Sequence, residues 1–192
     1  MSTARTHFRE ALSLLSNLIE DEAFISSVDS ASKALSSCLQ SGGKILSCGN
    51  GGSMSDAMHF AEELSGKFRE DRPAYAAIAL SSPAHITCVA NDYGFDKIFS
   101  RGVEALGCQG DVLLAISTSG NSSNVLEAAH AAKSKGMKVL ALTGGDGGEL
   151  ASLSDYEIRI PWDGYSDRVQ EMHIKCIHAM IDSIERSFIS FS

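Results

Sequence analysis

Short apolar runs alternate with longer amphipathic stretches along most of the chain. Apolar runs of five or six residues are typical of strands that are buried on both faces of a parallel sheet. We predict strands at residues 44–48, 76–80, 111–116, 138–143 and 156–160. Helical patterns separate these runs, so the sequence predicts an α/β fold with a doubly wound, mainly parallel five-stranded sheet flanked by helices.

Residues from about 3 to 40 carry helical periodicity with no strand between the helices. One apolar stripe comprises Phe8, Leu12, Leu15, Leu18 and Ile19, and a second comprises Phe24, Val28, Ala31, Leu35 and Leu39. Asp21 and Glu22 lie near the break. We predict a helical hairpin at 1–41 ahead of the α/β part at 42–192, the two making effectively one domain. The stripes could pack on the α/β part or on another subunit, and the second choice would make the hairpin an oligomerisation element.

Charge and cysteine content narrow the classes of function. The formal net charge of −8 argues against nucleic acid or an anionic membrane as the main partner. The five cysteines are scattered and form no CxxC pair, which favours a reducing cytosol. No run approaches the roughly 20 apolar residues that a membrane span needs. We therefore expect a cytoplasmic protein that binds neither nucleic acid nor membrane.

The richest polar stretch is residues 117–122, Ser-Thr-Ser-Gly-Asn-Ser, between a predicted buried strand and an amphipathic helix. Free backbone N–H groups and the positive end of the helix dipole favour an anion at such a position. Gly120 lets the backbone approach a ligand closely, and Ser122 is placed to be the N-cap. An ordinary Ser-capped turn would need only one hydroxyl. Four hydroxyls in six residues favour a phosphate-binding loop.

Two further glycine-rich turns, at 49–53 and 144–148, also follow predicted strands. The first opens a helix on which His59 and Glu63, four residues apart, share a face. Such a pair is common on exposed helices, although its place after a ligand-type turn favours a role in a site. We interpret Asp146 in the last turn as a turn-forming residue and not a ligand, and His173 as a core or interface histidine. No Walker lysine motif, GxSxG elbow or GxGxxG fingerprint occurs. The residues alone thus indicate a binder of phosphosugars or other phosphometabolites, with proton-transfer chemistry as an option.

Five segments together resemble the phosphoheptose isomerases of the sugar-isomerase (SIS) domain family. They are residues 47–53, 56–64, 117–122, 142–144 and 167–173, and the resemblance extends over nearly the whole chain. It implies a flavodoxin-like SIS fold, a homotetramer and zinc as cofactor. It also implies conversion of D-sedoheptulose 7-phosphate to D-glycero-D-manno-heptose 7-phosphate through an enediol. That reaction is the first step in supplying ADP-heptose for lipopolysaccharide or another surface glycan.

The resemblance assigns roles to residues that match the family's motifs. The phosphate would be held by Ser117, Thr118, Ser119 and Ser122. The rest of the sugar would meet Asn50, Gly51, Gly52, Glu63, Asn91, Asp92, Asp167 and Gln170. The metal and catalytic positions match His59, Glu63, Gln170 and His178, with Glu63 and His178 moving protons between C1 and C2.

One spacing needs explanation, because Gln170 and His178 are eight residues apart. On one helix they would be separated by about 12 Å along the axis and roughly 80° around it. Joint ligation of one ion would then require converging side chains, a helix that starts late, or a neighbouring subunit. We expect a site that is completed at a subunit interface.

A non-catalytic function is the main alternative. Some relatives of these isomerases are SIS-domain binding proteins, including a tetrameric partner of a replication initiator, and they keep the Ser/Thr loop without the full acid–base set. A sugar-phosphate-sensing regulator is a third class, but it would normally carry a DNA-binding segment that the N-terminal helices do not resemble. Retention of His59, Glu63, Gln170 and His178 favours the enzyme.

Overall fold

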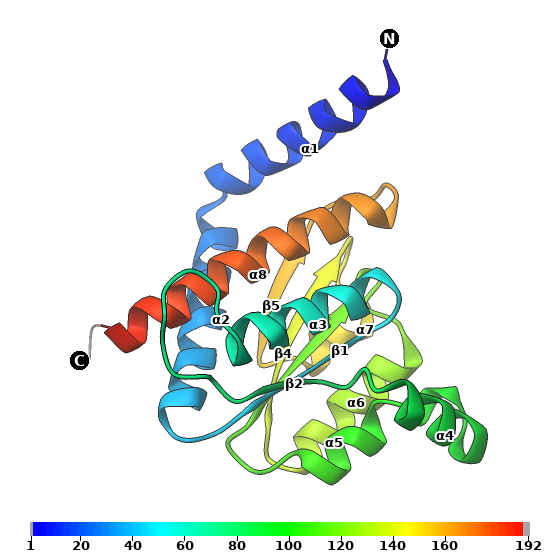
Figure 1. Ribbon diagram of the computed structural model, residues 1–192. Helices are drawn as coiled ribbons and strands as arrows, with labels where there is room; N and C mark the ends of the chain where they lie inside the picture. The colour runs from blue at the N-terminus through cyan, green and yellow to red at the C-terminus, as the bar shows by residue number, and fades with distance from the viewer. Residues whose placement is uncertain (1, 190–192) are drawn as a thin grey trace.

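A computed structural model describes residues 2–189 and contains a five-stranded sheet in the order β2-β1-β3-β4-β5, with every pair of neighbouring strands parallel (Figure 1). The strands are β1 (Ile45–Gly49), β2 (Ala77–Ala79), β3 (Val112–Ser117), β4 (Lys138–Gly144) and β5 (Tyr156–Ile160). The predicted strands and the doubly wound parallel sheet are therefore confirmed. Every residue of β1 and β3 is buried, which explains why these strands are mostly apolar in the sequence.

Helices cover both faces of the sheet. They are α1 (Thr3–Glu20), α2 (Glu22–Gln40), α3 (Gly52–Ser65), α4 (Pro83–Tyr93), α5 (Ser100–Leu106), α6 (Ser123–Ser134), α7 (Gly148–Leu153) and α8 (Ser166–Ile189), with a short 3-10 turn at Phe95–Lys97. Alternate strand residues point to opposite faces. On β3, Leu114 and Ile116 join a core with α2, α3 and α8, whereas Leu113 and Ala115 join a second core with α4, α5 and α6.

The two expected N-terminal helices are present, and one residue joins them. Asp21 lies outside helical geometry, and its Oδ1 accepts hydrogen bonds from the backbone N–H groups of Ala23 at 2.9 Å and Phe24 at 3.1 Å. It therefore ends α1 and N-caps α2. In Figure 1, α1 leads away from α2 rather than lying along it, while α2 packs against α8 and β5. No helix among residues 2–189 is both long and apolar enough to cross a membrane.

The strand order places a topological switch point between β1 and β3. The chain passes from β1 to β2 on one side and then continues to β3 on the other. Open α/β sheets bind ligands outside the carboxyl ends of the strands at such a point. Gly49 at the end of β1 is in register with Ile116 near the end of β3. The glycine-rich turn after β1 and the Ser/Thr loop after β3 are therefore neighbours.

Candidate active site

The Ser/Thr loop lies between the end of β3 and the start of α6. Ser122 is the N-cap residue, as predicted, but its side chain makes no capping bond. Instead, the Ser117 hydroxyl donates to Ser122 Oγ at 3.1 Å. The first N–H groups of α6 thus have no side-chain cap at the positive end of the helix dipole. This arrangement suits an anion such as a phosphate group.

The third glycine-rich turn, residues 144–148, packs against the Ser/Thr loop. Gly120 has φ +65°, and a Cβ there would run into the carbonyl of Gly147. The N–H of Leu150 donates to Gly120 O at 2.9 Å, and the N–H of Glu149 donates to Asn121 Oδ1 at 2.9 Å. Sequence reasoning treated residues 144–148 as turn chemistry and missed this contact. The close approach of two glycine-rich backbones fixes the position of the loop.

A pair of amides joins the turn after β1 to the helix after β3. Asn50 and Asn124 donate to each other's side-chain oxygens, both at 2.8 Å. Asn124 is 2% exposed, and sequence reasoning missed it. The only available signal was a polar residue in the first turn of a largely apolar helix. Gly51, with φ +55°, is the N-cap of α3 and makes no side-chain cap, so a second open helix N-terminus faces the same region.

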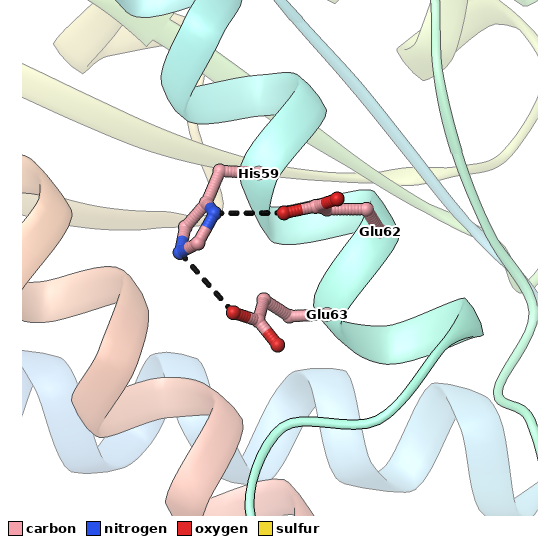
Figure 2. A group of neighbouring side chains, drawn as sticks. All are labelled: His59, Glu62 and Glu63. Carbon is pink, nitrogen blue, oxygen red and sulfur yellow. Dashed lines mark hydrogen bonds and ion pairs between the residues drawn. The ribbon is translucent and has the colours of Figure 1, made fainter.

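A group of ionisable side chains lies further along α3 (Figure 2). Figure 2 shows the His59 ring between two carboxylates of the same helix: Nδ1–H donates to Glu62 Oε1 at 3.0 Å, and Nε2 lies 3.5 Å from Glu63 Oε1. His178, on α8, brings its Nε2 to 2.9 Å from His59 Nε2. Burial first, and then the neighbouring His59 ring, lowers the pKa of His178. The predicted His59, Glu63 and His178 therefore meet at the contact between α3 and α8.

This group could hold a metal ion. One ligand atom from each of His59, Glu62 and Glu63 lies within 4.8 Å of the others. The two imidazole Nε2 atoms lie at hydrogen-bond distance, so one ring donates its Nε2–H to the other. Imidazole nitrogens and a carboxylate are preferred ligands of divalent transition metals, so the donor set fits such an ion. Glu62 was not among the predicted ligands, although its spacing of three residues from His59 is a signal that sequence reasoning could have used.

Gln170 lies at a different level of the same helix pair. A Cβ on Gly52 would stand 2.5 Å from Gln170 Oε1, so this side chain covers the first turn of α3. Helix α8 runs unbroken from Ser166, which rules out the late-starting helix as an explanation of the spacing. Gln170 and His178 are thus about 12 Å apart along one axis. Among residues 2–189, no hydrogen bond connects Gln170 with His59, Glu63 or His178.

The other predicted sugar contacts lie at helix ends and are exposed. Asp167 is in the first turn of α8, where its Oδ1 accepts from the N–H of Arg168 at 2.8 Å. Asn91 and Asp92 are in the last turn of α4, and Asn91 Nδ2 donates to Asp92 Oδ1 at 2.7 Å. Within the described part of the chain, no hydrogen bond links these three residues to the Ser/Thr loop. None links them to His59, Glu63 or His178 either.

A hollow of about 430 Å³ adjoins the Ser/Thr loop. Its lining comes from the end of β4, from the loops that follow β3, β4 and β5, and from the first turn of α8. It comprises Thr118, Ser119, Gly144, Gly145, Asp146, Trp162, Asp163, Gly164, Ser166 and Val169. Small-molecule sites have volumes of about 300–1,000 Å³, so the space suits a sugar phosphate. Two of the four predicted phosphate ligands, Thr118 and Ser119, border it.

One more carboxylate of α3 has an unusual environment. Asp56 is one turn ahead of His59, and its Oδ2 is buried without a hydrogen-bond partner among the described residues. Burial raises the pKa of Asp56 to about 6, and the nearby His59 opposes the rise. The surroundings of Asp56 therefore disfavour a negative charge that has no cation beside it.

His173 is a core histidine, as predicted. It is fully buried, and its Nε2–H donates to the carbonyl of Thr143 at 2.9 Å. Burial lowers the pKa of His173 to about 4, although the bond to Thr143 opposes the shift.

This environment predicts a pH-dependent loss of stability. A histidine in the unfolded chain has a pKa of about 6.5. Between pH 6.5 and 4, His173 therefore binds a proton in the unfolded state but not in the native state. The free energy of unfolding should fall by about 3 kcal/mol over this range through His173 alone. Urea denaturation of the wild type and of His173→Gln at several pH values measures the difference. Parallel pH curves for the two proteins would contradict the prediction.

Comparisons with known proteins give the family. The sequence model of the SIS domain matches residues 6–144. Phosphoheptose isomerase from Pectobacterium atrosepticum is 57% identical over 182 residues, which covers 95% of this chain and 94% of the relative. Phosphoheptose isomerase from Vibrio cholerae is 55% identical, with 95% of both chains covered. The solved structure of phosphoheptose isomerase from Neisseria gonorrhoeae superimposes with a TM-score of 0.89 at 43% identity, covering 95% of this chain and 97% of that one.

Proposed function

The chain belongs to the phosphoheptose isomerases of the SIS-domain family, and on that premise we propose that it converts D-sedoheptulose 7-phosphate to D-glycero-D-manno-heptose 7-phosphate. The observation that carries the proposal is the meeting of His59, Glu63 and His178 at the contact between α3 and α8. This acid–base set distinguishes an isomerase from a SIS domain that only binds a phosphosugar. The product would supply ADP-heptose synthesis for lipopolysaccharide or another surface glycan.

The Ser/Thr loop binds the phosphate in this proposal. The hydroxyls of Ser117, Thr118, Ser119 and Ser122 surround it, and the uncapped N-terminus of α6 adds backbone donors. The sugar chain contacts Asn50, Gly51, Gly52, Asn91, Asp92, Asp167 and Gln170. Binding energy from the phosphate, which does not react, holds the carbonyl end in place for proton transfer.

Proton transfer falls to Glu63 and His178. Isomerisation removes a proton from the carbon next to the carbonyl and protonates the carbonyl oxygen, which gives an enediol. It then returns a proton to the former carbonyl carbon while the hydroxyl on the neighbouring carbon loses its proton, which gives the aldose. The Glu63 carboxylate is a suitable base for the carbon-bound proton. His178, whose ring is held by His59, exchanges the proton on oxygen.

Zinc is the proposed cofactor, with His59, Glu63, Gln170 and His178 as its ligands. Bound zinc would stabilise the negative charge that develops on the carbonyl oxygen. Because His178 meets His59 within the chain, the separation of Gln170 from His178 along α8 supports a site in which a neighbouring subunit supplies Gln170. The ring of His59 needs a fixed orientation for this role, and the bond from Nδ1–H to Glu62 provides it.

The role of Glu62 can be tested by Glu62→Gln. The glutamine can no longer hold Nδ1–H of His59 with a charged acceptor, so the ring loses its preferred orientation and basicity. We expect zinc affinity to fall about 10- to 100-fold. Competition with a chelating dye measures the affinity without substrate. Glu10→Gln is the control, because it neutralises another exposed carboxylate, one that lies 3.4 Å from Arg168. Unchanged zinc affinity in Glu62→Gln would show that Glu62 does not orient His59.

We place the protein in a homotetramer in the cytoplasm. Phe8, Leu12 and Ile19 of α1 are 77%, 64% and 57% exposed, and their spacing puts them on one helix face. A stripe of this kind, on a helix that leads away from the rest of the chain, supports residues 1–41 as the oligomerisation element. All five cysteines are free, in keeping with a reducing compartment.

The proposed function is tested by incubating the purified protein with sedoheptulose 7-phosphate and following the aldose product. Turnover that depends on added zinc supports the proposal. Binding of the sugar phosphate without turnover, with or without zinc, would reject it. That result would favour the alternative, a SIS-domain binding protein that partners a replication initiator.

A further inference from the structure

The connection from α3 to β2 carries an arginine whose side chain turns back into the protein. The Arg72 side chain is only 8% exposed. Its guanidinium donates to five oxygens: Glu185 Oε1 at 2.7 Å, Glu63 O at 2.7 Å, Leu64 O at 2.9 Å, and Gly66 O and Pro73 O, both at 3.2 Å. The Tyr75 ring covers it, with the Cζ atom 4.3 Å from the ring centroid. All three guanidinium nitrogens are therefore engaged.

These contacts close the end of the helix that carries the reactive group. The last carbonyls of a helix have no partner within it, and a cation there complements the helix dipole. Arg72 fills this role with Nη2 on the carbonyl of Glu63 and Nη1 on that of Leu64. The backbone of Glu63, the proposed base, is thus held directly by a buried guanidinium.

The same guanidinium also reaches α8. Glu185, 5% exposed, accepts from Nε of Arg72 and is seven residues beyond His178. Seven residues are two helical turns, so Glu185 and His178 lie on the same face of α8. Arg72 therefore connects the backbone of one proposed proton-transfer residue with the helix that carries the other.

The burial of this pair has a consequence for function. Arg69, three residues earlier in the chain, also pairs with α8 through Asp182 at 2.9 Å, but its side chain is 57% exposed. A solvent-exposed ion pair of that kind contributes little to fixing the position of one helix against another. A buried, multiply bonded arginine has no alternative partner, so its geometry is fixed. Among the described residues, Arg72 is the charged side chain that bridges the C-terminal end of α3 and α8 with both partners buried.

We propose that Arg72, with Glu185, is a positioning residue that sets the distance between Glu63 and His178. It thereby keeps these two side chains correctly placed for proton transfer and for metal binding. The proposal rests on the isomerase function above. Loss of the guanidinium would let α3 and α8 separate or slide at this end. A misplacement of about 1 Å at a reacting centre can cost about 100-fold in rate.

The experiment compares Arg72→Lys, Glu185→Gln and the double variant Arg72→Met/Glu185→Met. The double variant replaces the buried ion pair by apolar side chains, which preserves folding where a single change would leave a buried charge. We expect kcat to fall about 100-fold with little change in KM, and zinc affinity to fall about tenfold. Lysine keeps the positive charge but cannot reach the same set of oxygens. We therefore expect Arg72→Lys to lose kcat as the other variants do.

Arg101→Met is the matched control. Arg101 also pairs with a glutamate, Glu104, and lies over a tyrosine ring, Tyr93, but it is half-exposed and lies on the other face of the sheet. Its kcat and zinc affinity should equal those of the wild type. If the folded double variant and Arg72→Lys, assayed well below their melting temperatures, keep wild-type kcat and zinc affinity, Arg72 is only a stabilising residue and the proposal is wrong. Wild-type protein without turnover would instead reject the isomerase function, whereas zinc affinity would still test Arg72.

Discussion

Glu63→Gln and His178→Gln will each lower kcat for sedoheptulose 7-phosphate by about 10²–10⁴-fold, the range that positioned acid–base groups contribute. Each change removes one of the two groups that exchange protons at the contact between α3 and α8. The Ser/Thr loop is untouched, so the affinity for the sugar phosphate should change far less than kcat. Steady-state kinetics and direct binding measurements on the same preparations separate the two effects.

His130→Gln is the control for these variants. His130 is an exposed histidine on α6, away from α3 and α8, and its substitution should leave kcat unchanged. The assigned roles would be wrong if Glu63→Gln and His178→Gln both kept near wild-type rates while remaining folded. Loss of activity together with loss of the native oligomer would point to a structural effect, which circular dichroism and size-exclusion chromatography detect.

Gly120→Ala will displace the phosphate-binding loop and raise KM about 100-fold, the cost of a misplacement of roughly 1 Å. The backbone at Gly120 has φ +65°, which an L side chain rarely adopts, and the new Cβ would run into the carbonyl of Gly147. The hydrogen bond from the N–H of Leu150 to Gly120 O holds the Ser/Thr loop against the turn at Gly147. The two segments therefore cannot move apart without breaking this bond. The Ser/Thr hydroxyls would move away from the N-terminus of α6. Titration with the sugar phosphate measures the loss.

Gly42→Ala separates backbone strain from collision. Gly42 has φ +80°, but a Cβ there meets nothing within 4 Å. Its substitution should cost about 1 kcal/mol of stability and leave sugar-phosphate affinity unchanged. Equal, small effects of the two alanines on affinity would mean that contact with residues 144–148 does not shape the loop.

The central strands of the sheet could be predicted from the sequence because β1, β3 and β4 are buried almost throughout. An unbroken apolar run such as residues 112–116 leaves few options besides a central parallel strand. The break between α1 and α2 was also visible, since Asp21 is a residue type that caps helices. What the pattern could not give was the direction in which α1 leaves α2, which depends on packing and not on periodicity.

Without the family resemblance, the site was predictable only where its residues lie close in sequence. His59 and Glu63 share a helix face, and the hydroxyls of the Ser/Thr loop lie within six residues of one another. The amide pair Asn50–Asn124 and the ion pair Arg72–Glu185 join residues 74 and 113 positions apart. Neither pair leaves a periodic signal, because each partner looks like an ordinary polar residue until the fold brings the two together.

Deuterium transfer from solvent is the most direct measure of the central claim, that this chain isomerises a heptose phosphate by moving protons through an enediol. Sedoheptulose 7-phosphate is incubated with the zinc-loaded protein in D₂O, and the sugar is followed by nuclear magnetic resonance. The account predicts an aldose 7-phosphate that carries deuterium from solvent at C2, with neither conversion nor exchange in Glu63→Gln. Recovery of unchanged, undeuterated sedoheptulose 7-phosphate from the wild-type reaction would contradict it.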